Sequence, residues 1–169
     1  HWAMDAMGRS GRAAMGAELV KVTDTRTALP DAALRVGDAT ADGLMLWLLD
    51  AQAAAIRVAT EPILMVSPDT LIAAPVPMFG DWDVCLLTRR RPTPIVNSVM
   101  AVRPSRAVAD LWWQMARDAR SLSVGSRTWG ADIDIIVETL QIKPSENAVR
   151  EHAGVKIRLL PVDGLLLTQ

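Results

Sequence analysis

The sequence predicts a single α/β domain in which helices pack on a mostly parallel sheet. The chain has 169 residues, about the length of one domain, and 50% of them are hydrophobic, which suffices for a full core. Segments with helical apolar spacing alternate with shorter apolar runs typical of strands. That alternation is typical of helices covering a parallel sheet. No repeat or low-complexity linker divides the chain, so residues 1–169 are interpreted as one domain.

The first part of the chain is expected to form two helices and two strands. Methionines such as Met4 and Met7 recur at helical spacing near the start, and a second apolar stripe follows Leu44. Pro62 precedes a four-residue apolar run typical of a strand buried on both faces. The expected elements are helices near 2–16 and 42–60, strands at 17–23 and 63–66, and a loop over 25–40.

The second part is expected to contain three strands and two helices. Ser105 is a suitable N-cap for the clearest of these helices, which carries an apolar stripe that includes Trp112. Pro161 ends the final strand, and His152 is expected on an exposed turn. The expected elements are strands at 82–88, 95–102 and 155–160, a helix from about 105 to 119, and a helix beginning near 130–132.

Charge and composition exclude several classes of function. The 18 Lys and Arg residues nearly balance the 19 Asp and Glu residues, which disfavours a nucleic-acid binder. A single cysteine and two histidines disfavour a disulfide framework and a Cys- or His-rich metal centre, so any metal must bind through carboxylates. No apolar stretch has the length of a membrane span, and no secretory signal is visible; a cytoplasmic location is therefore expected.

Three aspartates follow expected strand ends. In a parallel sheet, ligands bind beyond the carboxyl ends of the strands, so Asp24, Asp69 and Asp163 are expected to share one edge. Carboxylate oxygens at such an edge suit Mg²⁺ or Mn²⁺, particularly when phosphates complete the coordination shell. A turn after Pro68 explains Asp69 as well, and a surface turn before Gly164 explains Asp163 equally well.

Several motifs follow one another along the chain. An apolar strand precedes Ser67-Pro68-Asp69-Thr70-Leu71, and it resembles the strand that carries the Asp-x-Asp motif of the GT-A-fold glycosyltransferases, which use nucleotide-diphospho-sugars. Together the matching segments cover roughly residues 17–163. The further segments are Asp81-Trp82-Asp83-Val84, the strand from Pro94 to Val102 with Asn97-Ser98, the helical segment Ala107–Met115, the turn Trp129-Gly130-Ala131-Asp132, and the late strand from Gly154 to Pro161.

The resemblance implies a Rossmann-like three-layer sandwich with a mostly parallel mixed sheet. It also implies transfer of a sugar from a UDP- or GDP-linked donor to a hydroxyl acceptor, with Mn²⁺ or Mg²⁺ as cofactor. Charge develops on the leaving diphosphate and must be stabilised, and a carboxylate can deprotonate the acceptor. The implied roles are catalysis for Asp132, metal binding for Asp69 and Asp163, and substrate binding for Asn97, Ser98, Trp129 and Gly130. Asp24 is also expected to bind substrate, because of its place at the end of a strand.

The chain departs from the family pattern in two places. Ser67 replaces the first carboxylate of the Asp-x-Asp pair, which removes a negative ligand or a ribose contact. The family's opening strand is expected to be missing or to lie upstream of His1. These departures favour an alternative, a catalytically degenerate GT-A domain that serves as a binding or interaction module. A nucleotidyltransferase is a third alternative, but it would require a Gly-rich phosphate loop.

Two further features each have two interpretations. Arg89, Arg90 and Arg91 are either a diphosphate clamp or a solvated loop between strands. Trp129 either stacks on a sugar ring or fills the core. Trp112 is expected to pack in the core rather than to bind a ligand, because it continues the apolar stripe of its helix.

Overall fold

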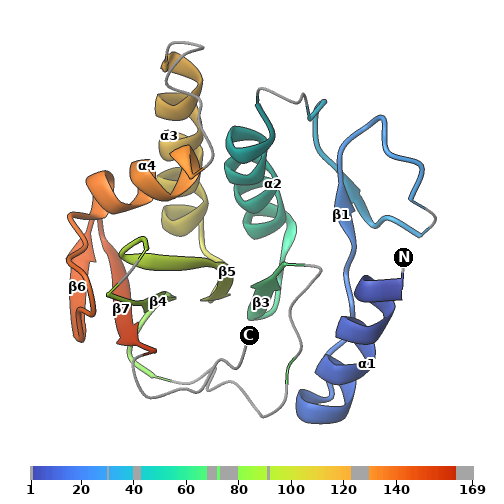
Figure 1. Cartoon of the computed structure of the whole chain (residues 1–169), viewed down its shortest axis with the longest axis horizontal. Helices are drawn as coiled ribbons and strands as arrows, with labels where there is room; N and C mark the ends of the chain where they lie inside the picture. Colours follow the sequence, from blue (N-terminus) through green and yellow to red (C-terminus); the bar gives the residue numbers. More distant parts are fainter. Residues whose placement is uncertain are drawn as a thin grey trace.

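The described residues of the chain form four helices and seven strands. A computed structural model describes residues 2–29, 31–39, 43–67, 72, 80–90, 92–122 and 130–162, apart from the side chains of Trp2 and Ser98 (Figure 1). In chain order the elements are α1 (Trp2–Met15), β1 (Val22–Thr23), β2 (Leu34–Arg35), α2 (Leu44–Val58), β3 (Ile63–Val66), β4 (Val84–Thr88), β5 (Ile95–Val102), α3 (Arg106–Ser121), α4 (Ala131–Leu140), β6 (Ala148–His152) and β7 (Val155–Pro161). The α/β class is thereby confirmed.

The main sheet contains five strands in the order β3-β5-β4-β7-β6. Within this sheet, β4 and β7 pair in parallel, whereas the β3–β5, β4–β5 and β6–β7 pairs are antiparallel. The prediction of a mostly parallel sheet is therefore wrong for the described strands. Short connections are the physical reason, because a parallel pair requires a crossover of a dozen or more residues. Residues 89–94 join β4 to β5, and Ala153-Gly154 joins β6 to β7.

Three strands differ from their predicted form. β3 is half-buried at the edge of the described sheet, not buried on both faces as predicted. β2 pairs in parallel with β1 inside the region predicted to be a loop, and the two form a small separate sheet. His152 ends β6 and pairs with Val155, so its placement on an exposed turn is wrong.

The β6–β7 turn has a clear local cause. Ala153 and Gly154 both have positive φ angles, 51° and 76°. A two-residue hairpin turn with positive φ at both positions matches the twist of antiparallel strands. The two residues therefore fold β6 back against β7, although β6 itself lacks the long apolar run by which the other strands are recognised.

One hydrophobic core lies between the sheet and three helices. Helices α2, α3 and α4 gather over one face of the sheet (Figure 1), and their buried side chains form one cluster with alternate residues of β4 and β7. Trp112 is fully buried within this cluster. Helix α1 lies beyond the β3 side of the sheet in Figure 1. The described helices of the core therefore form one layer on the sheet, not the two layers of the expected three-layer sandwich.

Glycine in α1 permits a close approach to the segment that follows. A Cβ atom added to Gly8 would lie 2.8 Å from Leu19 Cδ2 and 3.3 Å from Leu19 Cβ. Real Cβ atoms do not tolerate the shorter distance, so a larger residue at position 8 would force the Leu19 side chain to shift. Glycine has a low helix propensity, and the close contact with Leu19 explains why it nevertheless occurs at position 8 of α1.

Helix α3 begins at the predicted cap, where the Ser105 side chain accepts a hydrogen bond from the Val108 backbone N–H at 3.2 Å. Ser105→Ala is expected to lower the free energy of unfolding by about 1 kcal/mol, because one N–H of the first turn loses its partner. Urea denaturation measures this change. Ser121→Ala, at the exposed other end of the helix, is the matched control and should change the stability by less than half as much; equal effects would contradict the capping role.

Candidate functional site

Two of the residues assigned to the sugar pocket meet in the structure. Asn97 on β5 donates a hydrogen bond through Nδ2 to Asp132 Oδ2 on α4, at 2.5 Å. The two residues are 35 positions apart in the chain, so the fold brings them together. The resemblance implies substrate binding for Asn97 and catalysis for Asp132, and the structure places both in a single cluster.

An irregularity of the sheet positions Asn97. Leu86 pairs with Met100 on β5, but the next residue, Leu87, pairs with Val96. This shift leaves Asn97, Ser98 and Val99 without partners on β4. Bulges of this kind redirect side chains and are frequent next to active sites. Because β3, β4 and β7 run in one direction and β5 in the other, Asn97 lies close to the edge at which β4 ends.

Asp132 lies in the first turn of α4 and is almost completely buried, with 2% of its surface exposed. Gly130 is the N-cap of this helix and has a φ of 92°, a backbone conformation that favours glycine. Within the described part of the chain, Asp132 Oδ1 has no hydrogen-bond partner. A buried oxygen without a partner costs free energy, so Oδ1 is an acceptor that the described residues leave unsatisfied.

Burial is the main influence on the titration of Asp132. Desolvation raises the pKa of Asp132 above its ordinary value of 3.8, and the hydrogen bonds from Asn97 and from backbone N–H groups only partly offset this. The negative charge of Asp134 raises the pKa further. A carboxylate whose pKa is raised toward neutrality is better matched to general-base work than an exposed one.

Two further residues, which the sequence prediction did not assign to the site, extend this cluster into the core. Gln52 on α2 donates through Nε2 to Asn97 Oδ1 at 3.3 Å, and Trp112 on α3 donates through Nε1 to Gln52 Oε1 at 3.1 Å. Gln52 is 6% exposed and lies among apolar residues of α2 such as Leu49 and Ile56. Its position three residues after Leu49 and four before Ile56 is the sequence signal that could have identified it.

Asp24 has a local role in the structure. Its carboxylate accepts a hydrogen bond from the Thr27 backbone N–H at 2.8 Å, and hydrogen bonds from Thr27 lower the pKa of Asp24. Arg35 binds carbonyl oxygens of the same loop, including that of Asp24. In Figure 1, β1 and α4 lie on opposite sides of α2. The structure therefore places Asp24 in a turn and does not bring it to the Asn97–Asp132 cluster.

The other predicted site residues are only partly visible. Gly130 is the N-cap of α4, two residues before Asp132. Ser98 lies on β5, and its side chain is not among the described parts of the chain. Asp69, Asp163 and Trp129 lie outside the described residues. The strands that precede the two aspartates, β3 and β7, end at the same edge of the sheet, but β5 and β4 lie between them. Three strand spacings correspond to about 14 Å.

A divalent cation is expected from the resemblance, yet the described residues do not provide a site for it. No group of three or more His, Cys, Asp or Glu side chains in the described ranges could hold a metal ion. Asp132 Oδ1 is a free carboxylate oxygen, but the neighbouring oxygen of the same group accepts the Asn97 amide. The residues that surround Asp132 therefore suit a hydrogen-bond donor better than a cation.

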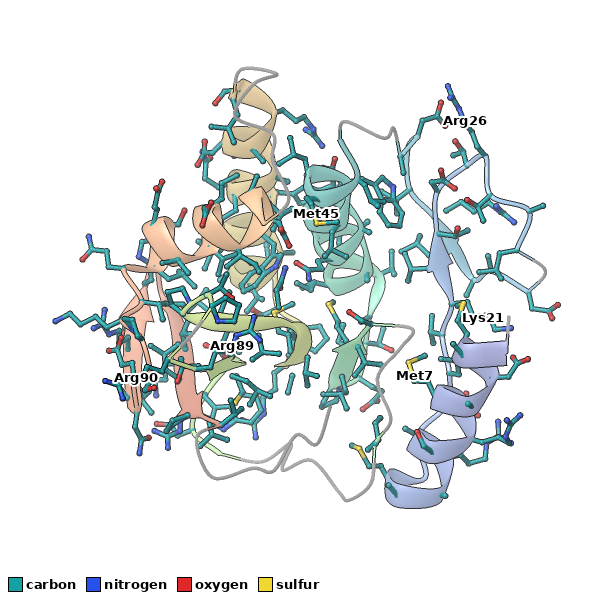
Figure 2. The ribbon with its side chains drawn as sticks, in the orientation of Figure 1. Met7, Lys21, Arg26, Met45, Arg89 and Arg90 are labelled. Carbon is teal, nitrogen blue, oxygen red and sulfur yellow. The ribbon has the colours of Figure 1, made fainter. Side chains whose placement is uncertain are left out.

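Arg89 serves the connection between β4 and β5. Its guanidinium donates to the Thr93 carbonyl at 3.3 Å and to Thr93 Oγ1 at 2.8 Å, and its backbone N–H donates to Pro94. In Figure 2, Arg89 lies over the sheet and Arg90 lies toward β6. The contacts of Arg89 favour the loop interpretation over a diphosphate clamp, while Arg91 lies outside the described residues.

Comparison with known proteins leaves the family open. No family model matches the chain, and neither a curated protein nor a solved structure matches it at a significant level. Among the helices that the structure describes, none combines the length and the apolar character required to cross a bilayer.

Proposed function

We propose that the chain is a glycosyltransferase-like protein of GT-A type. It binds a UDP- or GDP-linked sugar and transfers the sugar to a hydroxyl group of an acceptor. The hydrogen bond between Asn97 and Asp132 is the observation that carries this proposal, because the resemblance implies that both residues act on the sugar or the acceptor, and the hydrogen bond places them side by side. The α/β class and the position of Asn97 near the end of β4 also support it.

Asp132 supplies the chemistry in this proposal. A sugar or acceptor hydroxyl donates its hydrogen bond to Oδ1, the buried oxygen that has no partner among the described residues. The acceptor hydroxyl oxygen attacks the anomeric carbon and its proton passes to Asp132 Oδ1. The bond between the anomeric carbon and the diphosphate breaks, and the diphosphate leaves with the electron pair of that bond. The raised pKa of Asp132 brings the carboxylate closer to the pKa required for such a base near neutral pH.

Mn²⁺ or Mg²⁺ is the proposed cofactor, with Asp69 and Asp163 as its proposed ligands. A hard cation bound to carboxylate oxygens would stabilise the negative charge of the diphosphate. The resemblance alone assigns these ligands, because both residues lie outside the described ranges. The role of Asp132 does not depend on them.

A specific observation favours a second candidate function. Ser67 directly follows β3, where the family pattern has a carboxylate. With one negative ligand fewer, metal affinity falls, and a GT-A domain that binds a ligand without turnover becomes the alternative. Calorimetric titration of UDP, GDP, UDP-glucose and GDP-mannose, with and without Mn²⁺, tests both functions. Binding followed by sugar transfer supports the enzyme, and binding without transfer supports the degenerate domain. No binding by folded protein overturns the enzyme and favours a degenerate domain that serves as an interaction module.

Asp69→Asn is expected to abolish the part of nucleotide-sugar binding that depends on Mn²⁺, because the amide removes the charge that attracts the cation. Ser67→Asp should act in the opposite direction and strengthen this binding about tenfold, since it restores a carboxylate ligand. Calorimetry at several Mn²⁺ concentrations measures both effects.

Asp110→Asn is the matched control for charge. Asp110 is an exposed residue of α3, and its only ion pair within the described chain is with Arg106 on the same helix. This variant should leave the affinity unchanged. If Asp69→Asn binds as tightly as this control in the presence of Mn²⁺, Asp69 is not a metal ligand.

A further inference from the structure

We infer that Trp112 and Gln52 are positioning residues that fix the direction of the Asn97 amide, and that they thereby keep Asp132 Oδ1 available for a hydroxyl group of the ligand. This inference rests on the proposed function, because the ligand is the nucleotide sugar or its acceptor. The two residues act through Asn97 and do not themselves contact the ligand. The four side chains, from Trp112 to Asp132, are called the amide relay below.

The direction of the relay follows from the indole group of Trp112. An indole N–H can only donate a hydrogen bond, so the Gln52 atom 3.1 Å from Trp112 Nε1 must be the carbonyl oxygen. Gln52 must then direct its NH₂ group toward Asn97, whose oxygen accepts at 3.3 Å. Asn97 is left with its own NH₂ group for Asp132. A donor-only group at one end thus determines the orientation of both amides.

This orientation gives the two oxygens of Asp132 different roles. Oδ2 accepts the Asn97 N–H, so it is occupied. Oδ1 keeps its lone pairs for a ligand when the carboxyl is ionised, and it is the oxygen that carries the proton when the carboxyl is neutral. Had the Asn97 amide the opposite orientation, its carbonyl oxygen would face the Asp132 carboxylate and repel the charged form.

Burial favours a single orientation of each amide in the relay. Trp112 is fully buried, and Gln52 is 6% and Asp132 2% exposed, so water competes little for these groups. In such an environment each hydrogen bond is stronger, and an unpaired polar group is more costly, than at the surface. An amide turned the wrong way would leave unpaired groups at both of its ends.

Other charged groups near the relay are few within the described structure. Asp134, on α4, is the charged residue whose field acts on the titration of Asp132. Asp50 on α2 forms an ion pair with Arg120 on α3. The eight residues of β5, Ile95–Val102, include no ionisable side chain. The titration of Asp132 should therefore be readable without strong interference from its neighbours.

The relay is tested by ¹H–¹⁵N NMR of the ligand-free chain during a pH titration. The Asn97 amide and the Trp112 indole signals are expected to shift with one shared midpoint, that of Asp132, and Asp132→Asn should remove this titration from both. The indole of Trp113 is the internal control, because its Nε1 has no hydrogen-bond partner among the described residues and takes no part in the relay. It should not follow this midpoint.

Gln52→Met cuts the relay while nearly preserving side-chain volume. The Trp112 signal should then lose its response, whereas the Asn97 signal keeps its own. The affinity for UDP-glucose or GDP-mannose, whichever the chain binds, should fall roughly five- to tenfold, because Asn97 is no longer held. The midpoint of the Asp132 titration in this variant should also move, and a purely structural role for Gln52 would leave that midpoint unchanged.

The possible outcomes separate the relay from the proposed function. A Trp112 signal that ignores the titration of Asp132 in the unmodified chain overturns the relay, whatever the chain binds. A shared midpoint in a folded chain that binds no nucleotide sugar retains the relay and overturns the proposed function. Equal affinity of Gln52→Met and the unmodified chain for the nucleotide sugar overturns the positioning role.

Discussion

Replacing Trp112 by alanine is expected to lower the free energy of unfolding by about 3–5 kcal/mol. Trp112 is fully buried between α2, α4 and the sheet, so the substitution leaves a large cavity in the only core cluster of the described residues. It also removes the partner of Gln52 Oε1, a buried acceptor. Because a domain of this size is stable by only about 5–15 kcal/mol, the variant should be close to unfolding at 37 °C.

Chemical denaturation followed by tryptophan fluorescence measures this loss. Trp113→Ala is the matched control, because Trp113 is the next residue of α3 and is only half-buried, with its ring beside Arg120. It should cost less than half as much as Trp112→Ala. Trp112→Phe separates the two parts of the effect, since it retains most of the volume and removes only the N–H. A loss of about 1–3 kcal/mol is expected for this variant. Equal losses in Trp112→Ala and Trp113→Ala would contradict the central packing of Trp112.

The helices were predictable from local signals. Apolar residues at helical spacing mark α2, α3 and α4, and Ser105 caps α3 as its sequence indicates. These features depend on residues three or four positions apart. The sequence therefore contains most of the information that determines where these helices begin and end.

Strand orientation was less predictable because it depends on connections. Alternating helices and strands suggest a parallel sheet, but three of the four pairings in the main sheet are antiparallel. The short link over 89–94 and the turn at Ala153-Gly154 determine two of these pairings. β6 was missed because Arg150, Glu151 and His152 give it no apolar run. An edge strand needs little apolar character, so its pattern resembles that of a turn.

Motifs singled out two residues that the fold brings into contact. Asn97 and Asp132 were both identified from motifs, and the structure joins them by a hydrogen bond. Gln52 is 45 positions from Asn97 and 60 from Trp112, so neither contact has a local signal. Packing of α2 against α3 brings these groups together. Asp24 was assigned from its place after a strand, and that place is equally suited to the turn it forms with Thr27.

Asp132→Asn is expected to stabilise the chain at pH 7 and to lower strongly the sugar transfer that we propose for it. Burial raises the pKa of Asp132 in the folded chain above the value near 3.8 of the unfolded chain. The folded state therefore holds this proton more tightly. The resulting stabilisation is complete below pH 3.8 and disappears as the pH rises through the folded-state pKa. Above the folded-state pKa the charged form is buried at a cost.

The asparagine removes that cost and keeps an oxygen that accepts the Asn97 N–H. At pH 7 the variant should be more stable by about 1 kcal/mol, and this gain should shrink to nearly zero at pH 3.8 and below. Thermal unfolding across this pH range measures the difference. Asp134→Asn is the matched control, because Asp134 is an exposed carboxylate in the same first turn of α4. It should be nearly neutral at pH 7, since it loses a negative charge that is favourable near a helix N-terminus but also relieves the repulsion between Asp134 and the Asp132 carboxylate.

Activity should respond in the opposite direction. An amide cannot take a proton from the acceptor hydroxyl, so sugar transfer by Asp132→Asn should fall about 10²- to 10⁴-fold, while Asp134→Asn keeps most of it. A residue present only to stabilise the fold would show the reverse pattern, with lower stability in the variant at neutral pH. If the variant is more stable and transfers sugar more slowly, Asp132 lowers the free energy of unfolding at neutral pH and is present for proton transfer. Loss of stability at pH 7 with transfer intact would remove Asp132 from the catalytic role.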